Sequence, residues 1–197
     1  MKQDWAEGLH ARIASAIKDA RANRPAQWLA DETERLGYPI SRAAIANYES
    51  GRKKGLDVAE LLILAAALRI PPLAILFPQL PNGPVEVLPG METSSWNAAA
   101  WFSGEANSPD PTRDPWPPSK QYELLRAVRE RHNQLLATAQ FYDYMERHIE
   151  TALGQKRPLR PRDPEMRAFK QQLETMKQEI TRLDNIIREN GGVTDDD

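Results

Sequence analysis

A short segment after Ser41 combines side chains that can form hydrogen bonds and close contacts with the edges of base pairs. Its apolar positions are Ile45 and Tyr48, so in a helix of 3.6 residues per turn the other residues lie on the opposite face. Arginine can donate two hydrogen bonds to guanine, asparagine can pair with the edge of adenine, and small side chains can touch thymine methyl groups. A helix presented in this way fits the major groove of DNA. The candidate base-contacting residues are Arg42, Ala43, Ala46 and Asn47.

Polar and basic residues on either side of this segment are placed for contacts with the DNA backbone. Lysine and arginine neutralise phosphates, and the N-terminus of a helix also attracts them. Consecutive cations are, on their own, often no more than a solvated surface, so they support DNA binding only together with the helix. The candidate phosphate-contacting residues are Gln27, Ser41, Arg52, Lys53 and Lys54.

Start and end signals divide residues 1–78 into five short helices. Capping boxes, an N-cap serine and first-turn prolines mark starts, and glycines mark ends. Apolar residues recur every three or four positions within each segment, which predicts amphipathic helices around one small core. The signals are Asp4 with Glu7, Pro25, Gly37, Ser41, Gly51, Asp57 with Glu60, and Pro71 or Pro72.

These signals coincide with a set of motifs, namely Leu29–Ala30, Gly37, Ser41–Arg42, Ile45, Glu49–Arg52, Leu64–Leu68 and Ile70–Pro71. With these motifs, residues 8–78 resemble the Cro and phage-repressor type of helix-turn-helix regulators, often called the XRE family. The resemblance implies a five-helix lambda-repressor-like domain whose third helix binds an operator. The segments IANYES, VEVLPG and WFSGE are similar to segments of regulators from actinobacteria and their phages. The chain departs from the family pattern at Ala26, where glutamine is usual, and in a longer turn between Gly37 and Ser41.

Composition limits the class of protein. The 197 residues include 26 Lys+Arg and 28 Asp+Glu, a formal net charge of -2, which excludes a uniformly basic nucleic-acid coat but allows a small basic surface. Cysteine is absent, and the three histidines have no metal-ligand spacing. No nucleophile elbow, P-loop or dinucleotide-binding fingerprint is present. We therefore expect no enzyme, cofactor, metal or small-molecule ligand, and, without a signal peptide or membrane segment, a cytoplasmic protein.

Proline marks a middle zone. Nine of the 16 prolines fall within residues 78–118, which predicts a proline-rich linker over 79–118. Within it, VEVLPG is compatible with a short strand pair or an extended arm, and Ser94 can cap a short helix that ends at Gly104. The tryptophans of this helix form either a structural apolar patch or a partner site.

Residues 119–190 have the pattern of two long helices that fold back as an antiparallel hairpin, followed by an acidic tail, 191–197, that we expect to be disordered. Apolar residues in both helices are spaced alternately by three and four positions, as in a coiled coil. Two helices alone bury little apolar surface, which favours a homodimer formed through the second helix. The alternative is a hairpin whose two helices pack only against each other within one chain. In the first helix the apolar positions, interrupted by His132 and Glu146, are Leu125, Val128, Leu135, Ala139, Tyr142, Ile149 and Leu153. In the second they are the candidate dimerisation residues Met166, Phe169, Leu173, Met176, Ile180, Leu183 and Ile187.

The sequence thus predicts an all-α protein with a DNA-binding domain, a linker and a helical hairpin. The main hypothesis is a sequence-specific regulator of transcription, acting as a repressor, that binds double-stranded DNA as a homodimer. The alternative is an interaction protein, such as an antitoxin or adaptor, that uses the hairpin and binds DNA only secondarily.

Overall fold

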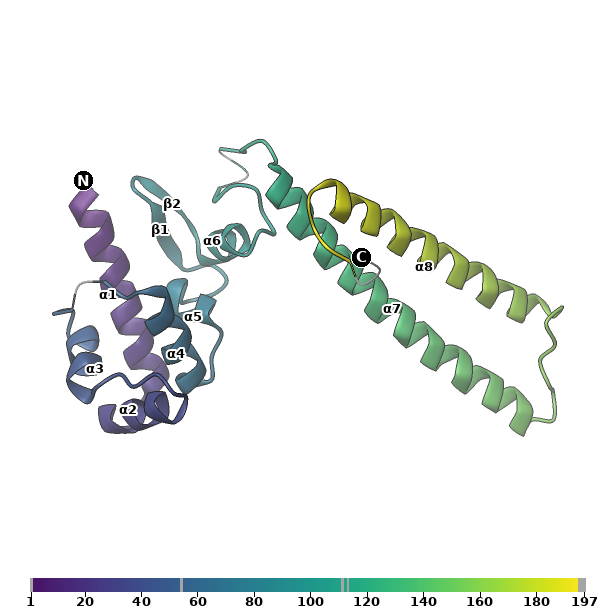
Figure 1. Ribbon diagram of the computed structural model, residues 1–197, viewed down its shortest axis with the longest axis horizontal. Coiled ribbons are helices and arrows are strands. Elements are labelled where there is room, and N and C mark those ends of the chain that lie inside the picture. Colours follow the sequence, from purple (N-terminus) through teal and green to yellow (C-terminus); the bar gives the residue numbers. More distant parts are fainter. Residues whose placement is uncertain (1, 54, 111, 113, 195–197) are drawn as a thin grey trace. The chain divides into compact units, whose positions relative to one another are not determined.

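The computed structural model describes residues 2–53, 55–110, 112 and 114–194, with side chains from residue 5 onward. The chain divides into two compact units, Met1–Trp116 and Pro117–Asp197. Within the described ranges the protein is mostly helical, with a single two-stranded sheet (Figure 1).

Five helices open the first unit, with starts that mostly match the sequence signals. Ser41 and Asp57 are N-caps as expected, and Asp57 forms a complete capping box with Glu60. The expected start at Asp4 is wrong, because the first helix begins at Lys2. The helices are α1 (Lys2–Arg21), α2 (Ala26–Arg35), α3 (Arg42–Glu49), α4 (Val58–Leu68) and α5 (Pro72–Leu76).

The core of these helices takes one fully enclosed aliphatic side chain from each of them. All five are 0% exposed, and smaller alanines and Leu68 fill the space around them. Such side chains hold the helices in one arrangement through apolar burial and close packing. The five are Ile17, Leu29, Ile45, Leu64 and Ile75.

The stretch expected as a linker is folded. Strands β1 (Pro84–Leu88) and β2 (Met91–Ser94) form an antiparallel hairpin, and Ser94 caps α6 (Ser95–Phe102) as predicted. Side chains of the hairpin and α6 build a small second core with the residue that follows α5. Its buried members are Phe77, Val85, Val87, Ala98 and Ala99.

The hairpin is also tied to α1, which explains why the first unit extends to Trp116 instead of ending near Pro78. The indole of Trp5 donates to the carbonyl of Glu86 at 3.2 Å. Of the aromatic residues in α6, Trp101 packs edge-on against Trp116, whereas Trp96 remains exposed. Alternating valines and a capped helix therefore outweigh the proline content of this stretch.

The second unit is a pair of helices, α7 (Lys120–Gly154) and α8 (Pro164–Glu189), lying side by side in opposite directions (Figure 1). Leu183 and Ile187 of α8 are buried against Ala127 of α7. Arg131 donates to Asp184 at 2.5 Å in a pair whose side chains are only 19% and 10% exposed.

The apolar face predicted for α7 is not the face that contacts α8. Rings on a neighbouring face of α7, those of Phe141, Tyr144 and His148, pack around Phe169 of α8. The predicted positions point away, and Leu125 is 46% exposed.

By contrast, the candidate dimerisation residues of α8 lie on the side that faces α7 of the same chain. Phe169, Leu183 and Ile187 are buried. Met166, Leu173, Met176 and Ile180 are half-buried. Helix α7 thus occupies the face that we expected a second chain to cover.

The segment 191–194 also differs from the expected disordered tail. Arg188 donates to the hydroxyl of Thr194 at 2.6 Å, and Thr194 is buried. A Cβ on Gly192 would clash with Ile187 and Leu124, so this segment folds back closely onto the helical pair. Residues 195–197 of the expected tail lie outside the described residues. Among the helices that the structure describes, none combines the length and apolar character needed to cross a bilayer.

Candidate nucleic-acid interface

Helix α3 presents its small and polar residues to solvent. Ile45 is 0% and Tyr48 is 4% exposed, because both side chains enter the core. The predicted base-contacting residues lie away from the core as a result. Arg42, Ala43 and Ala46 are exposed, and Asn47 is half-buried. The hydroxyl of Ser41 accepts the N–H of Ala44 at 3.1 Å, so this predicted phosphate contact also caps the helix.

Among the residues that the structure describes, three of the predicted DNA-contacting side chains have no internal partner. Within the described part of the chain, the side chains of Arg42, Asn47 and Arg52 make no hydrogen bond or ion pair. A ligand can therefore bind them without first breaking a contact inside the protein. Exposed polar side chains without an internal partner are hydrated, and they can exchange this water for an external hydrogen-bonding group.

Lys53, a predicted phosphate contact, is instead held inside the domain. Its ammonium donates to Glu60 at 2.6 Å and lies 4.4 Å from the centre of the Tyr48 ring. The hydroxyl of Tyr48 donates to the same carboxylate. Lys53 thus joins the end of α3 to the start of α4, which the sequence did not reveal. Lys54 lies outside the described residues.

The cluster formed by Tyr48, Lys53 and Glu60 has a defined charge state. Burial, aided by the hydrogen bond to Glu60, raises the pKa of Tyr48 to about 12. The hydrogen bond to Glu60 is also the main cause of a raised pKa for Lys53. Burial acts to raise the pKa of Glu60, but hydrogen bonds from Lys53, Tyr48 and the N–H of Asp57 outweigh it, and the net pKa is lowered. At neutral pH the cluster is therefore an ammonium–carboxylate pair beside a neutral phenol.

Gln27 lies at the open N-terminus of α2. Pro25 precedes this helix and supplies no side-chain cap, and the first turn has no acidic residue. The first N–H groups of a helix lack internal partners, so this end can accept an anion. The amide nitrogen of the exposed Gln27 donates one hydrogen to Asp31 at 2.7 Å, and a side-chain amide has a second hydrogen that an anion could accept.

The turn from α2 to α3 is fixed by a buried threonine. Thr33 is 0% exposed, and its hydroxyl accepts the N–H of Ile40 at 2.9 Å while donating to the carbonyl of Ala30 at 2.8 Å. Gly37 turns the chain with φ +86, a conformation that side chains rarely adopt. The longer turn is thus anchored to the core through Ile40, and the start of α3 is held in place.

A buried ion pair anchors the other end of α3. The guanidinium of Arg21 donates to both carboxylate oxygens of Glu49, at 2.6 and 2.7 Å, and the two side chains are 14% and 11% exposed. Burial of both partners and the bidentate geometry make this contact specific. A glutamate at the end of a predicted helix indicates a structural role, but its partner in α1 could not be identified from spacing.

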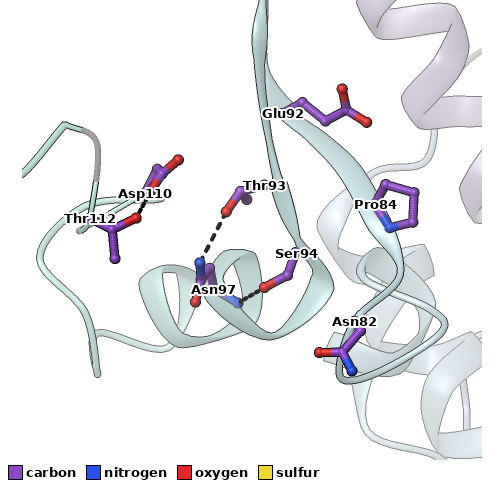
Figure 2. Close-up of a pocket in the computed structure, with 8 residues that line it drawn as sticks. All are labelled: Asn82, Pro84, Glu92, Thr93, Ser94, Asn97, Asp110 and Thr112. Atoms are coloured by element: carbon purple, nitrogen blue, oxygen red, sulfur yellow. Dashed lines mark hydrogen bonds between the residues drawn. The ribbon is translucent and has the colours of Figure 1, made fainter.

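A hollow lies beside the β-hairpin and α6, with a volume of about 380 Å³. Figure 2 shows Asn97 bonded to Thr93 on one side and Asp110 bonded to Thr112 on the other. Among the described residues, no three His, Cys, Asp or Glu side chains are grouped to hold a metal ion. The hollow is polar but offers no convergent catalytic set, so α3 remains the candidate site.

Comparison of the chain with models of known families, with curated proteins and with solved structures gave no match. The geometry of α3 and the resemblance in residues 8–78 are therefore the basis for assigning a function.

Proposed function

We propose that this protein is a sequence-specific DNA-binding regulator of transcription, with a lambda-repressor-like helix-turn-helix domain and a repressor mode of action. The observation that carries the proposal is the exposed face of α3, where Arg42 and Asn47 have no partner in the described structure. In the major groove these side chains would contact bases, with Ala43 and Ala46 allowing close approach. Repression would follow from occupation of an operator that overlaps a promoter.

The backbone contacts in this proposal are fewer than the sequence suggested. Among the described residues, Arg52, Ser41 and the N-terminus of α2 with Gln27 are the groups that would bind phosphates, and Lys54 stays a prediction from the sequence. Lys53 would contribute only by exchanging Glu60 for a phosphate, because its ammonium is already paired.

The test selects bound duplexes from a randomised DNA library and adds footprinting on DNA that flanks the protein's own gene. We expect one enriched site, and Arg42→Ala should weaken binding to it by about 1–3 kcal/mol and relax the preference at one base pair. Arg167→Ala removes one exposed arginine of α8 and should leave binding unchanged. No enriched sequence at physiological salt would contradict the proposal.

A second candidate function is an interaction protein whose helical pair binds a partner, such as an antitoxin or an adaptor. The observation in its favour is the row of exposed apolar side chains on α7, which include Leu125, Tyr142 and Leu153. A measurement of hydrodynamic mass distinguishes the two candidate functions. A homodimer without aggregates favours the regulator, and a chain that aggregates when purified alone favours an interaction protein that lacks its partner.

A further inference from the structure

Helix α7 has two apolar faces, and only one of them is used within the chain. The face toward α8 includes Ala127, which is buried with Leu183 and Ile187. The other face, called here the outer stripe, keeps the alternating spacing of three and four positions characteristic of coiled coils. The outer stripe consists of Leu125, Val128, Leu135, Ala139, Tyr142, Ile149 and Leu153.

The outer stripe is exposed along most of its length. Leu125, Val128 and Leu135 are 46%, 44% and 39% exposed, and Tyr142 and Leu153 are 46% and 54% exposed. At 1.5 Å per residue the stripe from 125 to 153 extends for roughly 40 Å. An apolar row of this length, interrupted at His132 and Glu146, is typical of an interface with another helix.

The charges of α7 indicate what kind of helix fits. Its first half, residues 120–136, contains four basic and two acidic residues, and its second half, residues 138–154, contains one basic and three acidic residues. Two copies of α7 in parallel would place like charges beside each other. Two antiparallel copies would place each half beside its opposite, so the helix is electrostatically complementary to itself.

The polar interruptions of the outer stripe have the same symmetry. His132 and Glu146 are the two such positions, and both are exposed. They lie seven residues before and seven residues after Ala139. An antiparallel copy centred on Ala139 therefore brings His132 level with the partner's Glu146, twice in the same dimer. The small side chain of Ala139 lets the two helices approach closely at the centre.

We propose that the outer stripe of α7 is a homodimer interface, covered by the outer stripe of a second copy in antiparallel orientation with the two Ala139 residues facing each other. The interface is two-fold symmetric, so the same surface is used on both copies. Each α8 keeps its position on its own α7, and the two hairpins form a four-helix bundle. The proposal does not depend on DNA binding.

The first experiment measures the mass of the full chain by light scattering and sedimentation. The wild-type chain should be a dimer at tens of micromolar, and Leu135→Lys should weaken dimerisation at least tenfold without loss of helical circular dichroism. Leu62→Lys changes a leucine of α4 that is 53% exposed and should leave the dimer intact. A monomeric wild-type chain, or a Leu135→Lys dimer as tight as wild type, would overturn the proposal.

The second experiment tests the orientation and uses the absence of native cysteine. Under mild oxidation Ala139→Cys should form a covalent dimer, because the two positions meet at the symmetry axis. Leu125→Cys alone should stay uncrosslinked, whereas a mixture of Leu125→Cys and Leu153→Cys chains should form mixed dimers. Self-crosslinking of Leu125→Cys as efficient as that of Ala139→Cys would overturn the antiparallel arrangement. Neither experiment contains DNA, so failure of this dimer interface and failure of DNA binding are observed separately.

Discussion

The hydroxyl of Thr33 accepts the backbone N–H of Ile40 at 2.9 Å, and this bond links the last turn of α2 to the residue before Ser41. Both residues are buried, at 0% and 4% exposure. The bond satisfies an N–H group in the turn that would otherwise be enclosed without a partner. The position of α3, and with it the exposed face that contains Arg42, therefore depends on a side chain that contacts no solvent.

We expect Thr33→Val to lower the free energy of unfolding by about 1–3 kcal/mol, because the N–H of Ile40 stays buried while its acceptor is lost. Urea denaturation followed by circular dichroism measures this change. Affinity for the selected DNA site should fall as well, since the turn sets the start of α3. Thr181→Val is the control, because that exposed hydroxyl bonds only to the carbonyl of Lys177 in its own helix. Equal effects of the two substitutions would contradict the role given to Thr33.

Arg52 and Lys53 should differ in how they affect the salt dependence of DNA binding. Arg52 is exposed and unpartnered within the described ranges, so Arg52→Ala should flatten the slope of log affinity against log salt by about one. Lys53→Ala should change the slope less, because the ammonium is already neutralised by Glu60 at 2.6 Å. Fluorescence anisotropy titrations at several salt concentrations measure both slopes. A larger slope change for Lys53→Ala would show that the pair with Glu60 opens in the complex.

Stability at acid pH should depend on Glu60. Its pKa is lowered in the folded protein from the ordinary value of 4.5, so the carboxylate contributes stability above that value. That contribution is lost as the pH falls below 4.5 through the folded pKa. Glu60→Gln removes the charge that pairs with Lys53, so it should lower the free energy of unfolding by about 1 kcal/mol at pH 7 and by progressively less as the pH falls.

Denaturation curves between pH 3 and pH 7 test this expectation. Glu34→Gln, which removes an exposed carboxylate of α2, is the control and should give a small difference from wild type at every pH. If the free energy of unfolding of Glu60→Gln stays below that of the wild type by the same amount at every pH in this range, the proposed dependence on the ionisation of Glu60 is wrong.

The features that the sequence predicted correctly are local ones. Ser41 and Asp57 cap helices because a cap requires only the residue type and the N–H groups two or three positions later. The enclosed Ile45 follows from helical periodicity in the same way. Contacts between elements were not predicted, because Arg21 and Glu49 are 28 positions apart and spacing does not identify partners at that distance.

Where two local interpretations competed, the three-dimensional packing decided between them. The short alternation of valines near several prolines is compatible with a strand pair or an extended arm, and burial of Val85 and Val87 where the hairpin meets α6 selects the strand pair. In α7 the most regular apolar row predicts the contact with the second helix of the hairpin. The aromatic ring of Phe169 packs instead against Phe141 and Tyr144 on a neighbouring face, which leaves the regular row exposed. A periodic pattern marks an apolar face but does not say which helix covers it.

The last prediction concerns the boundary of the first unit. Phe77 is 5% exposed because the hairpin and α6 cover it, and its ring lies 5.9 Å from that of Phe102. A fragment of residues 1–116 should therefore unfold cooperatively, whereas a fragment of residues 1–78 should be less stable by about 2–3 kcal/mol, the value of one buried aromatic side chain. In the full chain, Phe77→Ala should lower the free energy of unfolding by about 3–5 kcal/mol. Phe102→Ala, at a position that is 57% exposed, should cost much less. Denaturation of the two fragments and the two variants measures all four values, and equal stability of the fragments would show that residues 79–116 are a linker after all.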